Sequence, residues 1–153
     1  MKARTRGRGA LTEAVRARLV EAAQGARQRA YAPYSHYRVG AALLGQSGAV
    51  YTGCNVENAS YGASICAERT AAVKAISEGE RTFVAIAVVT ANGGTPCGIC
   101  RQFLSEFAPD LRVIIADAEG RVHSESALAD LLPDSLGTAK LPAPPCSLAE
   151  AGS

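Results

Sequence analysis

Three cysteines in two short motifs constrain the fold of this chain more than any other feature. Cys66 is followed by Glu68 in a C-x-E motif, and Cys97 and Cys100 follow a proline in a P-C-x-x-C motif. Three thiolates can hold one zinc ion and leave a fourth position for water, which is the arrangement of a catalytic zinc site rather than a closed structural one. The chain must therefore fold so that two segments far apart in the sequence meet at one metal.

The spacing within each motif predicts a helix that begins there. Cys97 and Cys100 are three residues apart, so both sulfurs can reach one metal from the first turn of a helix. Glu68 shares the site with Cys66 only if Cys66 also lies in the first turn of a helix. Two helix N-termini and the guanidinium of Arg69 would then offset the charge of three thiolates. We therefore expect Glu68 to be the general acid/base that acts on a zinc-activated water.

These motifs resemble those of the small, three-cysteine cytidine deaminases. The resemblance rests on residues 53–58 (GCNVEN), 66–71 (CAERTA) and 96–102 (PCGICRQ), and it extends over about residues 12–137. In zinc deaminases the glutamate of the signature is not a ligand but moves protons. The resemblance implies hydrolysis of cytidine and 2′-deoxycytidine to the uridine nucleosides and ammonia in pyrimidine salvage, with one zinc per subunit. Zinc-bound hydroxide is expected to attack C4 of the pyrimidine while Glu68 carries the protons.

Five further residues are assigned to the nucleoside substrate. Asn55 and Glu57 follow a predicted strand, and strand alternation points both side chains the same way, where an amide and a carboxylate suit neighbouring sugar hydroxyls. The resemblance implies that these two bind the ribose and that Tyr37, Tyr61 and Ala67 also contact substrate. Tyr37 stands where the family usually has phenylalanine beside the pyrimidine, so its hydroxyl requires a partner or water.

The resemblance also implies a homotetramer with sites completed across subunit interfaces. Tyr61 resembles a tyrosine that completes the site of a neighbouring subunit. Leu136 stands near the place where the family commonly has an interface aromatic, and it keeps bulk without ring stacking. A main-chain carbonyl near Thr95 is expected to accept a hydrogen bond from the departing amine. His36 is interpreted as a loop or packing histidine, because the metal already has three ligands.

Hydrophobic patterning predicts an α/β fold, a three-layer α/β/α sandwich around a five-stranded mixed sheet. The expected helices cover residues 12–30, 66–77, 97–107 and 126–132, and the expected strands 38–44, 49–54, 83–90, 111–117 and 120–124. Residues 11–137 form the catalytic domain in this interpretation. Residues 1–10 are expected to be a disordered basic arm, and residues 138–153 a flexible tail that contains prolines.

Composition narrows the possible partners and the compartment. Sixteen Lys and Arg residues nearly balance 14 Asp and Glu residues, aromatic residues make up 5%, and there is no tryptophan, so no nucleic-acid partner is expected. The longest apolar run, residues 83–89, is far too short to span a membrane. Five cysteines, an odd number, argue against a disulfide framework, and thiolate ligands suit the reducing cytoplasm, where we expect the protein.

Three alternatives remain open from the sequence. The C-G-I-C pair at 97–100 resembles a dithiol redox motif, but that function leaves Cys66 and Glu68 without a role. A closed structural zinc site with Cys54 as the fourth ligand likewise gives Glu68 no role. The third is a deaminase of another cytosine nucleoside such as blasticidin S. That family shares C-A-E and P-C-x-x-C but departs from the N-V-E-N sequence at 55–58.

Overall fold

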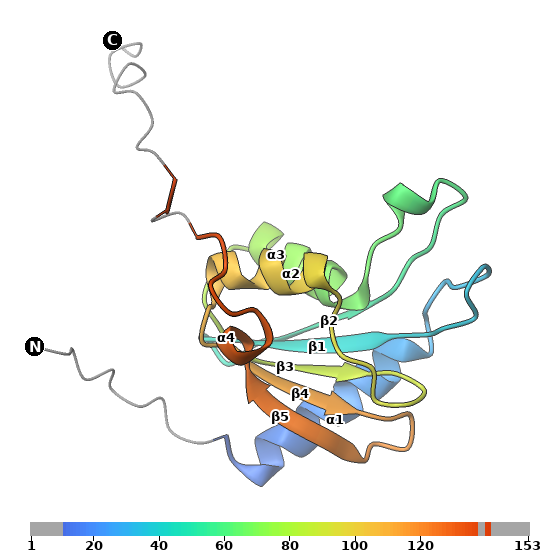
Figure 1. The fold of residues 1–153 in the computed structure, drawn as a ribbon. Helices are drawn as coiled ribbons and strands as arrows, with labels where there is room; N and C mark the ends of the chain where they lie inside the picture. The colour runs from blue at the N-terminus through green and yellow to red at the C-terminus, as the bar shows by residue number, and fades with distance from the viewer. Residues whose placement is uncertain (1–10, 138–139, 142–153) are drawn as a thin grey trace, which may run out of the picture.

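The computed structural model describes residues 11–137 and 140–141, in which four α-helices and five strands form one α/β unit. The predicted arm 1–10 and most of the predicted tail lie outside the described residues. Figure 1 shows the elements, which in chain order are α1 (Glu13–Arg27), β1 (Gly40–Gly45), β2 (Val50–Cys54), the 3₁₀ helix η1 (Tyr61–Ala63), α2 (Ala67–Ser77), β3 (Phe83–Val89), α3 (Gly98–Phe107), β4 (Arg112–Ala116), β5 (Val122–Ala127) and α4 (Leu128–Leu131). None of the helices in the described part of the chain is long and apolar enough to cross a membrane.

The five strands form one mixed sheet in the order β2-β1-β3-β4-β5. β1 pairs antiparallel with β2 and β3, β3 pairs parallel with β4, and β4 pairs antiparallel with β5. Helix α1 lies on one face of the sheet, and α2 and α3 lie on the other (Figure 1). The predicted three-layer sandwich with a five-stranded mixed sheet is therefore confirmed.

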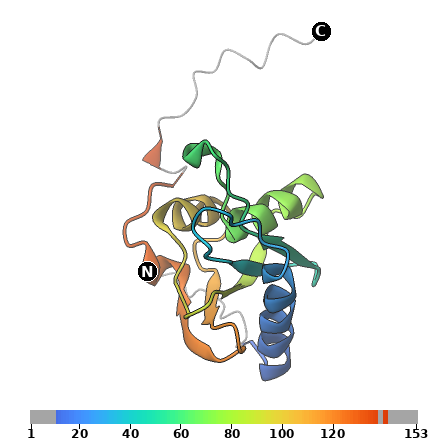
Figure 2. The same ribbon diagram turned by 90° about the vertical axis from the view of Figure 1, so that its right-hand side faces the viewer.

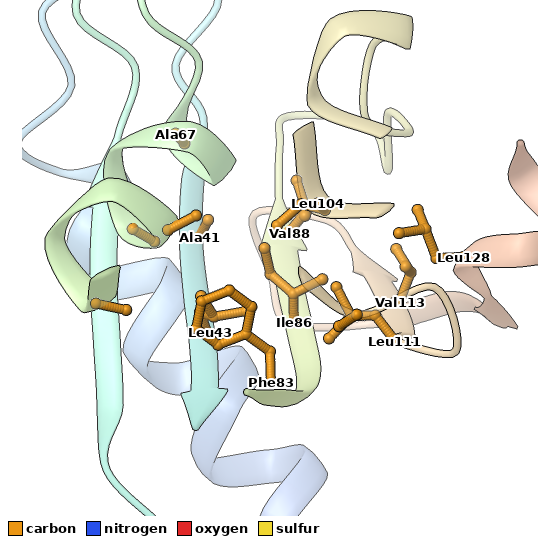
Figure 3. Close-up of a cluster of buried hydrophobic side chains, with 14 of the residues drawn as sticks. Ala41, Leu43, Ala67, Phe83, Ile86, Val88, Leu104, Leu111, Val113 and Leu128 are labelled. Carbon is orange, nitrogen blue, oxygen red and sulfur yellow. The ribbon is translucent and has the colours of Figure 1, made fainter. Parts of the chain in front are cut away.

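The sheet is buried on both faces because its central strands alternate between two apolar layers. One layer packs under α2 and α3, and Figure 3 shows several of its members, which include Ala41, Leu43, Ile86, Val88, Val113 and Ile115. The other packs against α1 and includes Leu19, Ala23, Ala42, Ala87, Val89 and Ile114. Burial of both faces explains why β3 and β4 are nearly continuous apolar runs in the sequence.

Gly53 in β2 allows α2 to lie very close to the sheet. A Cβ at this position would lie 2.5 Å from the main-chain nitrogen of Ala71 and 2.6 Å from the carbonyl oxygen of Ala67. Any side chain there would push the first two turns of α2 away from β2. Since Cys66 and Glu68 lie at the start of α2, this close approach sets their position.

The helix and strand predictions hold in the centre of the domain and fail at its C-terminal end. Thr12 caps α1 as expected, accepting a hydrogen bond from Val15 N–H at 3.3 Å. The predicted helix over 126–132 was wrong at its start, because β5 stays paired with β4 as far as Arg112 and Ala127. Only Leu128–Leu131 is helical. The edge strand predicted over 120–124 is shifted along the chain and covers Val122–Ala127.

Segments 28–39 and 55–66 project beyond the same end of the sheet (Figures 1 and 2). They are joined by main-chain hydrogen bonds, from Tyr31 N–H to Asn55 O at 3.0 Å and from Glu57 N–H to Tyr31 O at 2.9 Å. The same end of the sheet receives the starts of α2 and α3. Loops and helix N-termini thus meet there around one cavity.

Candidate active site

The three predicted metal ligands lie together at the starts of two helices. Cys66 is the N-cap of α2, Cys97 is the N-cap of α3, and Cys100 lies in the first turn of α3. Their sulfur atoms lie within 4.8 Å of one another, and those of Cys66 and Cys97 are 3.8 Å apart. Two sulfurs held about 2.3 Å from one tetrahedral zinc ion would also be about 3.8 Å apart. The donor set therefore fits zinc.

The fourth cysteine of the described residues does not join this group. Cys54 ends β2, and the cluster within the described ranges consists of Cys66, Cys97 and Cys100. All four are free thiols. The closed four-cysteine site thus finds no support in the geometry of the described chain, and the redox pair would leave the clustering of Cys66 with Cys97 and Cys100 unexplained.

The surroundings favour a thiolate at Cys66. Arg69 donates a hydrogen bond from Nη2 to the sulfur of Cys66 at 3.7 Å, as predicted from the sequence. A hydrogen bond with Cys100, assisted by Arg69, lowers the pKa of the Cys66 thiol to about 5, although burial opposes the shift. The same hydrogen bond and burial raise the pKa of Cys100. Among the described residues, the buried Nε of Arg69 has no hydrogen-bond partner, which further marks this corner as one that suits negative charge.

Glu68 lies beside the cysteines with its side chain almost fully enclosed. The residue is 4% exposed and lines the same cavity as Cys66 and Cys97. Burial raises the pKa of its carboxyl group to about 7. A carboxyl group with such a pKa can both accept and release a proton near neutral pH.

The cavity extends from the cysteines to a polar end formed by loops. It has a volume of about 260 Å³, and four loop residues, Ser35, Tyr37, Asn55 and Glu57, line it together with Cys66, Cys97 and Glu68. A neighbouring hollow of about 360 Å³ shares Ser35 and Glu57 with it and is also lined by Tyr61. Two of the three predicted metal ligands, the predicted acid/base and the two predicted ribose contacts thus line one space, and the third ligand, Cys100, lies buried behind it.

Glu57 holds the adjacent loop through its carboxylate. One oxygen accepts hydrogen bonds from the main-chain N–H groups of Tyr34 at 2.9 Å and Ser35 at 3.2 Å, and the other accepts the Ser35 hydroxyl. The hydrogen bond from the Ser35 hydroxyl is the main reason why the pKa of Glu57 is lowered. The carboxylate therefore stays charged, and it keeps acceptor capacity for a further hydroxyl group.

Asn55 also uses its side chain to fix this loop. Its Oδ1 accepts from the main-chain N–H of Val39 at 2.8 Å, and its Nδ2 donates to the carbonyl of Tyr37 at 2.8 Å. One N–H and one lone pair of the amide remain for another group. Sequence reasoning assigned Asn55 only to substrate, whereas the structure adds a role in shaping the loop.

The other predicted contact residues are placed in three different ways. Tyr37 lines the cavity, and its hydroxyl finds the required partner in Asn92 Oδ1 at 2.8 Å. Tyr61 is 75% exposed and lines only the neighbouring hollow. Ala67 has none of its surface exposed and belongs to the core. The substrate contacts of Tyr61 and Ala67 stay predictions.

Arg101 is a functional residue that sequence reasoning missed. It donates to the carbonyl of Pro96 at 2.8 Å, to the carbonyl of Leu131 at 2.8 Å and to the hydroxyl of Thr95 at 3.2 Å. These bonds hold the segment that leads into Cys97. Its place directly after the P-C-x-x-C motif was the available signal, but an arginine on a helix usually faces solvent.

The chain is similar to a family of known enzymes. The family model described as the cytidine and deoxycytidylate deaminase zinc-binding region matches residues 14–116. A cytidine deaminase of Halalkalibacterium halodurans is 50% identical over 118 residues, which cover 75% of this chain and 89% of the relative. A cytidine deaminase of Sporosarcina psychrophila is 45% identical over 119 residues, covering 76% and 87%.

Solved structures give the same similarity in three dimensions. The crystal structure of cytidine deaminase from Burkholderia pseudomallei superposes with a TM-score of 0.75 at 48% identity, covering 82% of this chain and 100% of that one. The crystal structure of cytidine deaminase from Mycobacterium tuberculosis gives a TM-score of 0.68 at 42% identity, covering 78% and 95%. The similarity therefore spans both the sequence motifs and the arrangement of the elements.

Proposed function

Because the chain belongs to the cytidine deaminase family, we propose that it removes the 4-amino group of cytidine and 2′-deoxycytidine by zinc-dependent hydrolysis. Water enters, and the uridine nucleoside and ammonia leave. The observation that carries this proposal is the buried carboxyl group of Glu68, which shares one cavity with Cys66 and Cys97, two members of the three-cysteine cluster. Three protein ligands and a carboxyl group that is not a ligand are what hydrolysis at a metal requires.

The protein's own groups divide the chemistry between them. Cys66, Cys97 and Cys100 would hold the zinc ion, which when bound acts as a Lewis acid that lowers the pKa of water. Glu68 takes the proton of the attacking water and gives it to N3 of the pyrimidine. Glu68 then moves the second proton to the leaving amine, so that one carboxyl group serves both halves of the reaction. Arg69 stabilises the thiolates throughout.

The loop end of the cavity orients the nucleoside. Glu57 accepts hydrogen bonds from ribose hydroxyls, and its lowered pKa keeps it charged for that purpose. Asn55 offers its remaining N–H group to the same sugar. The ring of Tyr37 lies beside the pyrimidine, and a carbonyl near Thr95 accepts a hydrogen bond from the departing amine. Thr95 lines the cavity, which supports this last assignment.

We further propose that the protein is a homotetramer in which Tyr61 completes the site of a neighbouring subunit. Large apolar side chains lie exposed, with Tyr61 at 75% and Tyr34 at 46% in the hollow next to the cavity, and Leu136 at 55% near the end of the described chain. A second subunit would cover such surfaces. The molecular mass from light scattering tests the assembly, and a monomer at every concentration would contradict it. The free thiols suit a reducing compartment, and a cytoplasmic role in pyrimidine salvage is part of the proposal.

Parallel assays of four substrates test the function. Cytidine, 2′-deoxycytidine, cytosine and blasticidin S are each incubated with the zinc-loaded protein, and loss of the cytosine ultraviolet absorbance is followed. Turnover of the first two, abolished by a chelator and restored by zinc, is the expected result. Turnover of blasticidin S alone would move the substrate assignment to that family, and absence of turnover in a protein with one zinc per chain would refute the proposal.

A further inference from the structure

The segment that joins β3 to α3, residues 90–96, forms one wall of the cavity and is anchored separately at its two ends. Its second half, Thr95 and Pro96, is held by Arg101, as described above. That anchor lies next to Cys97 and so fixes the metal end of the segment. The first half, residues 90–94, has its own side-chain hydrogen bonds, and the partners in these bonds are neither the metal ligands nor Glu68.

Tyr37 supplies the main contact to the first half. Its hydroxyl donates to Asn92 Oδ1 at 2.8 Å, a bond between residues 55 positions apart. The hydroxyl of Thr90 approaches the same oxygen at 3.5 Å and accepts the main-chain N–H of Gly94 at 2.6 Å. The side chain of Tyr37 and residues 90–94 are therefore joined in one hydrogen-bonded network. Within this network Tyr37, Thr90 and Gly94 line the cavity.

Two glycines let the segment fit between side chains on its two sides. A Cβ on Gly94 would overlap the hydroxyl oxygen of Tyr37, whereas its next neighbours, Thr90 Oγ1 at 3.5 Å and Tyr37 Cζ at 3.6 Å, would be in ordinary contact. Gly93 has a φ of +75°, and a Cβ there would lie 2.9 Å from the ring of His123. His123 is itself held by Asp117, with Nε2 and Oδ2 2.8 Å apart. The segment thus lies between Tyr37 and His123.

We propose that Asn92 is a positioning residue for nucleoside binding: by accepting the hydroxyl of Tyr37, it fixes the Tyr37 ring and the Gly93–Gly94 wall against each other. The bond acts on the part of the cavity that meets the pyrimidine. It leaves the metal end, which Arg101 holds, unchanged. Loss of the bond therefore weakens substrate binding without loss of zinc. The kinetic part of this inference rests on the proposed function, and the structural part does not.

A double-mutant cycle in KM tests the positioning role. Tyr37→Phe and Asn92→Ala should each raise KM for cytidine about 2- to 10-fold, the range expected for one neutral hydrogen bond. The kcat should change less than about 2-fold, and zinc should stay at one per chain. The double variant should be no worse than the poorer single variant, because both remove the same bond. Tyr31→Phe, on an exposed tyrosine that does not line the cavity, is the matched control and should leave KM unchanged.

A second cycle tests the packing without any assay of activity. Gly94→Ala should lower the thermal midpoint of the zinc-loaded protein in the wild-type background and do so much less in the Tyr37→Phe background, where the overlapping oxygen is gone. Amide hydrogen exchange at residues 91–95 should rise in Asn92→Ala and in Tyr37→Phe.

The outcomes that overturn the inference are distinct from those that overturn the proposed function. The coupling would be refuted if Gly94→Ala lowered the thermal midpoint equally in the wild-type and Tyr37→Phe backgrounds. It would also be refuted if amide hydrogen exchange at residues 91–95 did not change, or if the effects of Tyr37→Phe and Asn92→Ala on KM were additive. If Tyr37→Phe or Asn92→Ala lost zinc, or lowered kcat without raising KM, the two halves of segment 90–96 would not be held independently, and that part of the inference would be refuted. If the wild-type protein did not turn over cytidine, the proposed function would fail, and the stability cycle would still decide on the coupling.

Discussion

The two ends of the cavity are built from different kinds of structure. The metal end consists of the starts of α2 and α3, where Glu68 is 4% exposed and Cys100 is fully buried. The loop end consists of the segments before β1 and after β2, in which Tyr37 is 37% exposed. Rigid helix starts hold the reacting groups in place, whereas loops supply binding contacts that can vary. From this difference we expect substitutions at the metal end to lower the rate and substitutions at the loop end to lower the affinity for substrate.

The same contrast appears in the two glutamates of the cavity. Burial raises the pKa of Glu68 to about 7, and hydrogen bonds led by the Ser35 hydroxyl lower the pKa of Glu57. The carboxyl group of Glu68 is therefore suited to proton transfer, and that of Glu57 is suited to remaining charged. Because the two effects have opposite causes, substitutions at the two positions should give different kinetic results.

Substitution of Glu68 should have the largest effect. Glu68→Gln keeps the size of the side chain but cannot carry a proton, so kcat for cytidine should fall at least about 10²- to 10⁴-fold. Zinc content and KM should change little, because the glutamate is not assigned as a ligand. Steady-state kinetics and metal analysis check both points, and a variant with near-wild-type kcat would remove Glu68 from the proton-transfer role.

Substitution of Glu57 should act mainly on affinity. Glu57→Gln removes the charge and should raise KM for cytidine about 10- to 100-fold, the range for a hydrogen bond to a charged group, with a smaller change in kcat. Glu80 offers a matched control, since it too accepts main-chain N–H groups, from Ser47 and Thr82, but does not line the cavity. Glu80→Gln should leave KM unchanged. An equal rise in both variants would mean that the loss reflects the fold rather than the site.

Substitutions of two glycines, one at each end of the cavity, should differ in their effect on the free energy of unfolding. Gly53→Ala would force a Cβ against α2 and should lower the free energy of unfolding by about 1–3 kcal/mol. Gly62, in the 3₁₀ helix η1 beside the loop end, has open space around it and no positive φ, so Gly62→Ala should stay within about 0.5 kcal/mol of the wild type. Urea unfolding of the zinc-loaded proteins measures both. A similar cost at the two positions would contradict the view that only the metal end depends on close helix packing.

The pH dependence of Glu57 gives the smallest expected effect. Its pKa in the folded protein lies below the ordinary value of 4.5, so the carboxylate is charged above that pH and is neutralised only as the pH falls through the lowered pKa. The ratio of KM between Glu57→Gln and wild type should therefore be constant from about pH 8 to about pH 5.5. A ratio that fell towards one within that range would show that Glu57 titrates there.

Local patterns predicted the metal end better than the loops around it. Ligand spacing alone requires helices that start at Cys66 and Cys97, and both helices begin there. The buried strands follow from apolar runs. The bonds of Tyr37 to Asn92 and of Arg101 to Pro96 join segments by tertiary geometry, which no local pattern encodes. The boundary of β5 was misplaced because strand pairing overrode a locally helical segment.

Both cysteines that begin these helices leave their own helix uncapped. Neither Cys66 nor Cys97 makes a side-chain hydrogen bond to the main chain of its helix, unlike Thr12 at the start of α1. The first turns of α2 and α3 thus gain order from whatever joins the two sulfurs. Zinc supply to the cell would then govern how long the polypeptide resists proteases, in addition to how much of it is active.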